Sequence, residues 1–260
     1  MYVKLAERAA QTFLDVMPDL PLDLMTDGKD PVNESLFDEV RIGPGEGGAR
    51  ARLEWMQLTR FERTLHVDCD VTLLVDISDV FALLDKFDLA VAHDQSRNAV
   101  GNSEPQEAGI PDAFPQFNCG VICYRNTPEV LGFLAEWRRL YLERGDPRDQ
   151  PTFRLLAWQS DLRIGVLPAE YNLVNLQLLY AWAAEHAAPR LLHTPRLHRK
   201  LKLDGHLHTD IDDLLGAPMA EKVRRLMKAR EINLTRRPLW RRKRWRMIRQ
   251  LKAEKAAQSD

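Results

Sequence analysis

Cysteine is scarce in this sequence, with three residues among 260. Cys119 and Cys123 lie four positions apart in a predicted strand, so we expect them to share one face but to be too far apart for a disulfide. The chain contains no C-x-x-C pair of the kind that holds zinc or performs redox chemistry. This composition excludes a disulfide framework and is typical of a reducing compartment, which predicts a cytoplasmic protein.

Long apolar runs are also missing. The longest, such as Val71–Val75 and Ala181–Ala184, are far shorter than the roughly 20 residues that cross a bilayer. The N-terminus lacks the charged, apolar and small-residue order of a signal peptide. We therefore expect any contact with a membrane to be peripheral, on its inner face. The chain is long enough for one sizeable α/β domain and an appendage.

The net charge of −1 conceals a strong asymmetry. Residues 222–255 carry fifteen of the 37 Lys and Arg residues and two acids, Glu231 and Glu254. The rest of the chain therefore holds 22 basic residues against 36 acidic ones. This split predicts a globular domain, residues 1–205, and a basic helical C-terminal arm, residues 206–260.

The arm places Trp240, Met247 and Leu251 among dense arginine and lysine. Such a composition suits an interfacial helix on anionic lipid, where each basic residue near the surface contributes about 1 kcal/mol. We therefore rank an anionic membrane surface, bound through residues 222–255, as the first partner, with docking of the arm on the acidic body close behind. Nucleic acid ranks last, because the chain carries no nucleic-acid-binding motif.

Apolar periodicity predicts strands that alternate with helices. We expect strands at residues 22–25, 64–67, 71–74, 89–92, 117–124, 164–167 and 190–193, and helices at 5–17, 49–60, 80–84, 128–143, 151–158, 210–215 and 220–230. Residues 29–48 and 95–115 are polar and rich in glycine and proline, which predicts loops, and a loop as long as the second is usually functional. The alternation indicates an α/β fold with a mostly parallel sheet flanked by helices.

Two aspartates follow the predicted strand at residues 64–67. On an extended backbone Asp68 and Asp70 point to the same side, at the strand end where open α/β sheets bind ligands. Carboxylates on one side repel each other unless a cation neutralises them, and hard ions such as Mg²⁺ or Mn²⁺ suit them. A solvated turn is the alternative interpretation, because an Asp-x-Asp pair at a strand end is commonly no more than that.

The order of several segments resembles one known family. The sequence RTLHVDCDVTLLVDISDVFALLDKFDLAVAHD, which begins at Arg63, is similar to the centre of GT-A glycosyltransferases, in particular family 8. Further matching segments follow in the family's order: YVKLAERAAQTFLDVMPDLPLDLMTD, FNCGV, DQ, LPAEYN and LHT. No one of these motifs is diagnostic, so the resemblance rests on their order along residues 2–198.

The resemblance implies a GT-A (Rossmann-like) enzyme that moves a sugar from a nucleotide-sugar donor, UDP-linked by analogy, to a glycan or lipid-linked acceptor with retention of configuration. It also implies a divalent cation held by Asp68, Asp70 and His193. A lone histidine after two leucines is more commonly an ordinary strand-end residue, but as a third ligand its nitrogen would favour Mn²⁺ over Ca²⁺. The other histidines nearby fit no common zinc spacing, and we keep none of them as ligands: His198, His206 and His208.

The same resemblance places further residues beside the donor. Asn118 would hydrogen-bond sugar hydroxyls and Gly120 would permit close approach, although both are equally compatible with an ordinary strand. One of Arg50 and Arg52 would contact the donor phosphates. The alternative is that both arginines are solvated helix residues.

Asp149 and Gln150 are the catalytic candidates that the resemblance implies, facing the transferred sugar. Asp149 is also placed to cap the helix that begins near Pro151, which is the simpler interpretation. A retaining reaction uses either a carboxylate nucleophile or front-side attack with polar side chains around an oxocarbenium-like state. Both mechanisms stay open.

Members of this family have a strand that precedes the segment beginning at Tyr2 and helps to hold the nucleotide base. We expect this strand to be missing here, to be supplied by other residues, or to lie upstream of the given start. Two other classes therefore stay open: a non-catalytic nucleotide-sugar-binding relative, and a membrane-surface adaptor that acts through its arm. An enzyme would lose turnover in Asp70→Ala and keep its fold, whereas an adaptor would lose function only without the arm.

Overall fold

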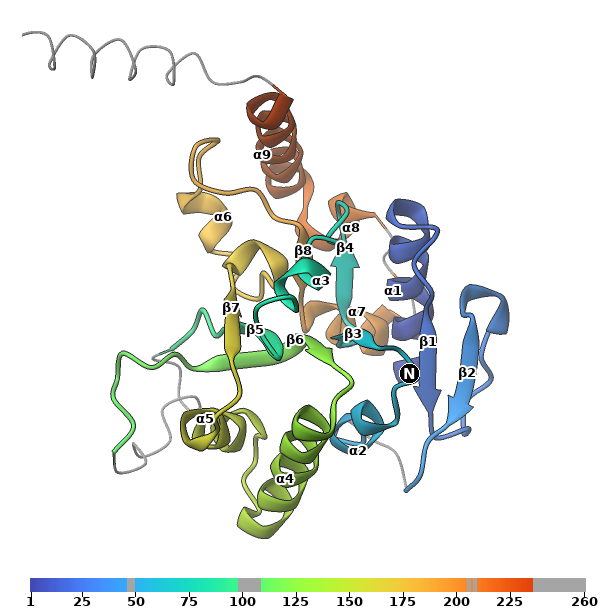
Figure 1. Ribbon diagram of the computed structural model, residues 1–260. Coiled ribbons are helices and arrows are strands. Elements are labelled where there is room, and N and C mark those ends of the chain that lie inside the picture. The colour runs from blue at the N-terminus through green and yellow to red at the C-terminus, as the bar shows by residue number, and fades with distance from the viewer. Residues whose placement is uncertain (46–49, 98–108, 205–206, 208–209, 236–260) are drawn as a thin grey trace, which may run out of the picture.

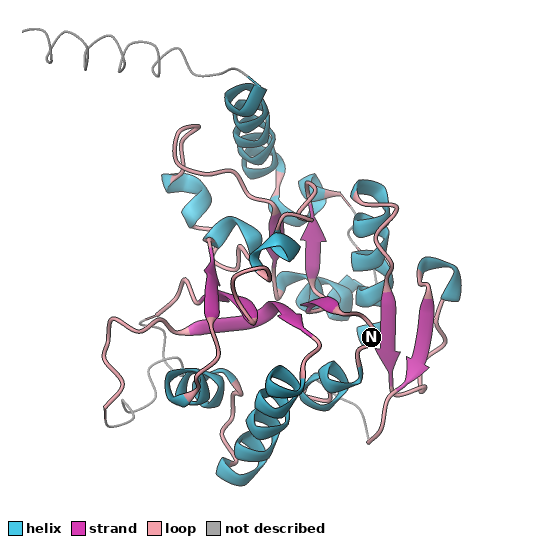
Figure 2. Ribbon diagram, viewed as in Figure 1, coloured by secondary structure: helices cyan, strands magenta, loops and turns pink. Residues whose placement is uncertain are grey.

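The computed structural model describes residues 1–45, 50–97, 109–204, 207 and 210–235. Its centre is a four-stranded sheet with helices on both faces (Figures 1 and 2). In spatial order the strands are β3 (Arg63–Val67), β6 (Phe117–Arg125), β5 (Leu89–His93) and β7 (Ile164–Leu167). This arrangement confirms the predicted α/β class.

The pairing of the strands is mixed, which corrects the expectation of a mostly parallel sheet. β6 is antiparallel to both β3 and β5, whereas β5 and β7 are parallel. The connection between β5 and β6, residues 94–116, is long enough for either direction, so the sequence pattern alone does not determine the pairing. Two small sheets flank the central one: parallel β1 (Asp23–Thr26) and β2 (Glu39–Ile42), and antiparallel β4 (Val71–Leu73) and β8 (Leu191–His193).

The helices of the described residues differ in length. The longer ones are α1 (Tyr2–Val16), α4 (Pro128–Arg144), α5 (Gln150–Gln159), α7 (Arg196–Asp204) and α9 (Ala217–Thr235), and the shorter ones are α2 (Arg52–Trp55), α3 (Val80–Leu83), α6 (Leu178–Ala181) and α8 (Ile211–Leu215). In α4 the Thr127 side chain accepts a hydrogen bond from the Val130 amide, and Gly145 ends the helix at φ 63°. The segment predicted as one helix over 49–60 contains only α2 and a 3₁₀ turn, Met56–Leu58.

Each face of the central sheet packs into its own hydrophobic cluster. Ala90 and Ala92 of β5 face the cluster that contains Phe13 of α1, whereas Leu89 and Val91 face the cluster built on α4 and α5. The alternation of side chains along a strand thus buries the sheet on both sides. A sheet covered on both faces leaves its strand ends as the place where polar side chains can gather.

A β-bulge in β6 changes which face its side chains point to. The register on β5 passes from Val91–Ile122 directly to Ala92–Asn118, so residues 119–121 of β6 have no partner there. Cys119 consequently packs in the cluster of α4 and α5, whereas Cys123 packs in that of α1. The expectation that these two cysteines share a face is therefore wrong, and the bulge is the cause.

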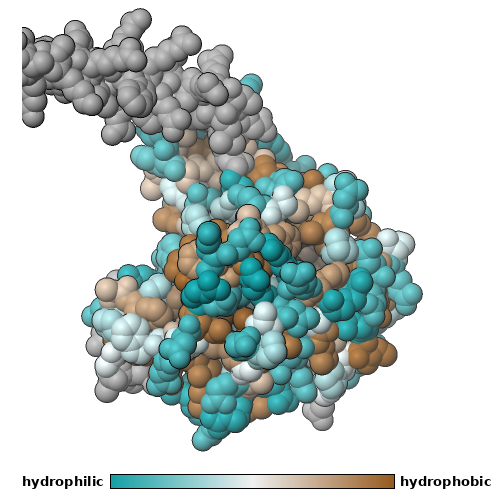
Figure 3. All heavy atoms as spheres, viewed as in Figure 1, coloured by the Kyte–Doolittle hydropathy of each residue, from teal (hydrophilic) through white to brown (hydrophobic). Residues whose placement is uncertain are grey.

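The C-terminal helices pack onto the body. Leu214 of α8 contacts Leu5 and Leu197, and Val223 and Leu226 of α9 join a cluster with residues of β8 and α6. None of the helices within the described residues is long and apolar enough to cross a membrane. Residues 236–260, which hold most of the cationic part of the predicted arm, and residues 98–108 of the predicted long loop lie outside the described residues. Hydrophobic side chains are scattered among hydrophilic ones on the face shown in Figure 3.

Candidate metal centre and active site

The Asp-x-Asp segment lies where β3 ends. Asp68 follows β3 directly, and its amide donates to the carbonyl of Gly120 in the bulge of β6 (2.8 Å). Cys69 and Asp70 form a turn before β4, so the two carboxylates converge through a turn and not through the extended backbone that the sequence suggested. Pairing of β8 with β4 sets Val71 opposite His193, which brings the imidazole beside Asp70.

Asp68, Asp70 and His193 converge in the folded chain although 125 positions separate the first from the last. The Nε2 atom of His193 lies 3.2 Å from Oδ1 of Asp70 and 3.7 Å from Oδ2 of Asp68. One potential ligand atom from each residue lies within 4.8 Å of the other two. Two carboxylate oxygens and one imidazole nitrogen form a donor set that suits a divalent cation of the Mn²⁺ or Mg²⁺ type.

The ring of His193 is held by two asparagines. Its Nδ1 lies 2.9 Å from Oδ1 of Asn172, whose amide nitrogen donates to Oδ1 of Asn118 (2.9 Å). The same Asn118 oxygen accepts the amide of Gly120 (3.1 Å). Because the nitrogen of Asn172 is committed to Asn118, its oxygen faces His193 and accepts from Nδ1–H, which leaves Nε2 directed at the carboxylates. Sequence motifs contain both asparagines, but only the fold shows this relay.

Gly120 makes room for the cluster. A Cβ atom at this position would lie 2.3 Å from Cε1 of His193 and 2.9 Å from Oδ2 of Asp68. Contacts that short do not occur between real side chains, so any larger residue would displace the imidazole or the carboxylate. The bulge and the missing side chain together let the backbone of β6 pass directly under the candidate ligands.

A buried ion pair adjoins the cluster. Arg52 of α2 donates to Oδ2 of Asp149 (2.5 Å) and to the carbonyl of Cys119 (2.7 Å), and its Nε lies 3.9 Å from Oδ1 of Asp68. The Trp137 indole donates to the carbonyl of Asp149 (2.8 Å). Asp149 is 1% exposed and makes no side-chain hydrogen bond to the first turn of α5.

This geometry tests the simpler interpretations of the two basic residues and of Asp149. The Asp149 carboxylate pairs with Arg52 and does not cap the helix. The side chain of Arg52 is 11% exposed, so it is no solvated helix residue. Arg50 is 40% exposed and reaches Oδ1 of Asp149 at 3.5 Å, on the outer side of the same carboxylate. Gln150, half-buried, is the first residue of α5.

Charge interactions hold the two aspartates in their ionised form. Burial alone would raise the pKa of the Asp68 carboxyl, but Arg52 and the neighbouring histidines lower it well below its usual range. Burial likewise opposes ionisation of Asp70, and hydrogen bonds from His193 and His198 outweigh it, so that its pKa is also lowered. Burial lowers the pKa of His193, yet Asp70 and Asp68 raise it above the ordinary value. Both carboxylates are therefore favoured in their ionised form, the form in which carboxylate oxygens bind a cation.

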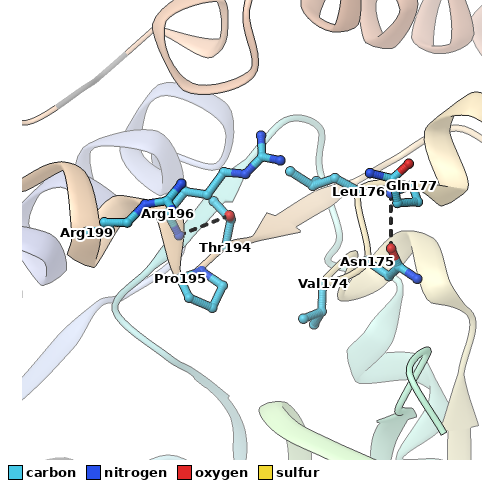
Figure 4. Close-up of a pocket in the computed structure, with 8 residues that line it drawn as sticks. All are labelled: Val174, Asn175, Leu176, Gln177, Thr194, Pro195, Arg196 and Arg199. Atoms are coloured by element: carbon cyan, nitrogen blue, oxygen red, sulfur yellow. Dashed lines mark hydrogen bonds between the residues drawn. The ribbon is translucent and has the colours of Figure 1, made fainter. Parts of the chain in front are cut away.

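A pocket of about 480 Å³ opens next to these residues along the chain. Thr194 and Arg196, just beyond His193, line one side with Arg199, and the turn at Asn175 and Gln177 lines the other (Figure 4). Two guanidinium groups at one wall suit an anionic ligand such as a diphosphate. The sequence patterns single out neither arginine, because the pocket forms only when α7 and this turn come together.

Comparison with known proteins identifies the family. The profile described as nucleotide-diphospho-sugar transferase matches residues 63–200, more than half of the chain. The chain belongs to this family. The matched segment contains Asp68, Asp70, Asn118, Gly120 and His193 together with the sheet that positions them. No curated protein sequence matches the chain.

Solved glycosyltransferase structures share the fold of this family member. GlyE of Streptococcus pneumoniae TIGR4 matches 74% of this chain and 51% of its own, with 18% identity and a TM-score of 0.52. An active-site mutant of LgtC matches 88% of this chain and 92% of its own, with 16% identity and a TM-score of 0.50. The bifunctional WbbM matches 86% and 50%, with 14% identity and a TM-score of 0.50. The chain thus spans about half the length of GlyE and WbbM, and the predicted GT-A fold and glycosyltransferase family are confirmed.

Proposed function

We propose that this chain is a divalent-cation-dependent glycosyltransferase that moves a sugar from a nucleoside-diphosphate donor to an acceptor hydroxyl. One observation carries the proposal. Asp68, Asp70 and His193 direct ligand atoms to within 4.8 Å of one another, above a glycine where a side chain would displace them. An imidazole beside two carboxylates favours Mn²⁺, and Mg²⁺ is the alternative ion.

The residues of the cluster have distinct tasks in this proposal. Asp68, Asp70 and His193 would hold the cation, and Asn172 keeps the ring of His193 in the required orientation. The cation would supply charge stabilisation to the diphosphate that departs when its bond to the anomeric carbon breaks. Gly120 keeps the space between backbone and ligands free.

The arginines serve the negatively charged part of the donor. Arg196 and Arg199 line the pocket that also contains Thr194, the residue after His193 in the sequence, and there they would bind phosphate oxygens. Arg52 adds a fixed positive charge, since burial, which lowers its pKa, is outweighed by Asp68 and Asp149, so that its pKa is raised. Arg50 is a second, more exposed cation at this edge, where donor phosphates would approach.

Asp149 and Gln150 divide the sugar-facing role. Because Asp149 is 1% exposed and paired with Arg52, we assign it to positioning that guanidinium and not to nucleophilic attack. Gln150, at the start of α5, then faces the transferred sugar, and Asn118 contacts its hydroxyls. LgtC, a structural neighbour, is itself described with an active-site mutant in which glutamine is replaced by glutamate. With the Asp149 carboxylate buried against Arg52 and not available for attack, the proposal favours front-side attack over a covalent intermediate.

Finer features of the proposal rest on the resemblance and on charge. The resemblance to family 8 supports a UDP-linked donor, retention of configuration and a glycan or lipid-linked acceptor. The cationic residues of 222–255 support peripheral binding to an anionic membrane surface from the cytoplasmic side, with the arm separated from the transferase domain near residue 205.

Titration calorimetry of the full chain with Mn²⁺ and a panel of nucleoside-diphosphate sugars tests the proposal. We expect one donor to bind in the presence of Mn²⁺, and no donor to bind in Asp68→Ala/Asp70→Ala. Asp15→Asn, a change of an exposed aspartate on α1, is the matched control and should bind as the wild type does. Proton NMR of the product then gives the anomeric configuration.

The opposite outcome is equally clear. If the folded wild type binds no donor, or binds one equally well with a chelator present, the cation-dependent transferase assignment is wrong. A donor that binds with Mn²⁺ but is never turned over with any acceptor or water would identify a non-catalytic nucleotide-sugar-binding relative.

A further inference from the structure

Two residues lie on the far side of Asp70 from the cluster described above. Nε2 of His198, in α7, is 3.4 Å from Oδ2 of Asp70, whereas Oδ1 of the same carboxylate faces His193 at 3.2 Å. Cys69 offers its thiol on the His198 side. One ligand atom each from Cys69, Asp70 and His198 lies within 4.8 Å of the other two. Asp70 therefore stands between two separate sets of ligand atoms, with one oxygen turned to each histidine.

Packing fixes the second set in place. Leu197 and Leu201, which flank His198 on α7, are buried with Leu5 of α1, and Cys69 packs against this group. The ring of Tyr2 meets the His198 ring edge-on, with centroids 5.4 Å apart. Side chains held by a packed helix are arranged before any ligand arrives, as an effective metal site requires.

We propose that Cys69, Asp70 and His198 form a second cation site, selective for Zn²⁺, that shares Asp70 with the first. A thiolate, a carboxylate and an imidazole are ligands that zinc accepts, and three protein ligands leave one position for water. The first site offers two carboxylates and an imidazole and no sulfur, which suits Mn²⁺ or Mg²⁺ better. The thiol of Cys69 thus makes the second site the one that prefers Zn²⁺.

Sharing of Asp70 couples the two sites. A Zn²⁺ ion bound to Cys69 and His198 places positive charge beside the first site and competes for the Asp70 carboxylate. Zn²⁺ therefore weakens Mn²⁺ binding at Asp68 and His193, and the weakening is reciprocal. This site is distinct from the proposed transferase function, because it would bind Zn²⁺ whether or not the chain transfers sugar.

Co²⁺ is the probe of choice, because it substitutes for zinc and its bond to a thiolate gives a charge-transfer band in the near ultraviolet. Chelator-treated full chain titrated with Co²⁺ should develop this band and lose it when Zn²⁺ is added. Cys69→Ser keeps the size of the side chain and should show no band. The other two cysteines, Cys119 and Cys123, are 0% exposed and cannot replace it.

His198 gives a second, independent measurement. His198→Gln should weaken Zn²⁺ binding by no less than the roughly 10- to 100-fold that the loss of an outer-sphere partner costs. His186→Gln, on an exposed turn, is the matched histidine control and should leave Zn²⁺ binding unchanged. Circular dichroism establishes that each variant is folded before titration.

The proposal is overturned by a wild-type Co²⁺ spectrum without the thiolate band, by a band that persists in Cys69→Ser, or by equal Zn²⁺ affinity in His198→Gln and wild type. Mn²⁺ titrations of Cys69→Ser test the first site, and hence the proposed function, separately from the zinc site. Wild-type Mn²⁺ affinity in that variant, weakened less by Zn²⁺ because Zn²⁺ then competes only for the first site itself, is the expected outcome. Mn²⁺ binding that Zn²⁺ still weakens to the same degree contradicts the proposal.

Discussion

The carboxylates on the two sides of Asp68 meet positive charge in different ways. On one side, Asp70 and His193 bring ligand atoms close to those of Asp68. On the other side, Arg52 already pairs with Asp149 and approaches Asp68 at 3.9 Å. The guanidinium side is neutralised by the chain itself, whereas in the proposed function an external cation would complete the imidazole side. The contrast separates residues that position the site from residues that bind a ligand.

The largest effect on stability should come from the guanidinium side. Arg52→Ala leaves the carboxylate of Asp149 buried without its nearest partner, which should lower the free energy of unfolding by about 3–5 kcal/mol. Arg50→Ala removes the exposed contact with the same carboxylate and should cost less than about 1 kcal/mol. Urea denaturation of the two variants measures the difference, and equal losses would show that Arg52 is not the partner on which Asp149 depends.

A change at the boundary between the two sides should affect both stability and binding. In Gly120→Ala the new Cβ would lie 2.3 Å from the His193 ring, so the ring must move. We expect a loss of about 1–3 kcal/mol in stability and loss of Mn²⁺ binding. In Gly132→Ala, within α4, the Cβ meets no atom within 4 Å, and the helix should gain up to about 1 kcal/mol. Mn²⁺ titration and thermal unfolding measure the two effects. Equal Mn²⁺ affinity and equal stability in Gly120→Ala and Gly132→Ala would contradict the prediction.

Asn172 tests whether the imidazole side depends on orientation. Asn172→Ala removes the acceptor that holds Nδ1 of His193 and should weaken Mn²⁺ binding by about 10- to 100-fold. Asn33→Ala, which removes an exposed turn hydrogen bond, should leave Mn²⁺ affinity unchanged. Calorimetry decides the matter: undiminished affinity in Asn172→Ala would mean that the ring needs no second residue to direct it.

The smallest effect should come from an aspartate–arginine pair at the surface. Hydrogen bonds from Arg163 outweigh the effect of burial and lower the pKa of Asp88, whose carboxylate lies 2.7 Å from the guanidinium. A lowered folded-state pKa gives stability that is present above the unfolded value of about 3.9 and is lost as the pH falls through the folded value.

Asp88→Asn should therefore lower stability by less than about 1 kcal/mol at neutral pH, because the pair is exposed. The difference from wild type should vanish in acid. Urea midpoints measured across this pH range check the prediction, and a difference that grows as the pH falls would contradict it. An aspartate–arginine pair at the surface is thus expected to contribute several-fold less to the free energy of unfolding than the buried pair of Asp149 and Arg52.

Elements with strong local signals were predictable. Helix α4 lies where Thr127, Pro128 and Gly145 place it, because capping side chains and a left-handed glycine act within a few residues. Strand β2 was not predicted within the loop expected at 29–48, because the polar–apolar alternation of Glu39–Ile42 is only four residues long and stands in a segment rich in glycine, proline and acids, and it pairs with β1 in the fold. Antiparallel pairing of β6 was missed because the neighbour of a strand is a tertiary choice.

The candidate site shows the same division. Asp68, Asp70 and the ordered motifs around them could be found from the sequence, because they occupy a few consecutive positions. His198 could not, since its spacing from Asp70 acquires meaning only when α7 packs beside Leu5. Arg52 was recognised as a candidate, but its pairing with Asp149 depends on α2 and α5 meeting at the end of β6. The division of the chain near residue 205 and the membrane role of residues 222–255 stay predictions.

What the sequence determined by itself was the chemistry available at the end of one strand and the family to which that order of segments belongs. Which of those groups meet depends on how the chain folds. Strand pairing carried His193 to Asp70, a bulge carried Gly120 beneath them, and helix packing carried Arg52 and His198 to opposite sides. The physical reason is that local sequence fixes backbone preference over a few residues, whereas a binding site needs side chains from distant segments, whose approach depends on burial of the whole core.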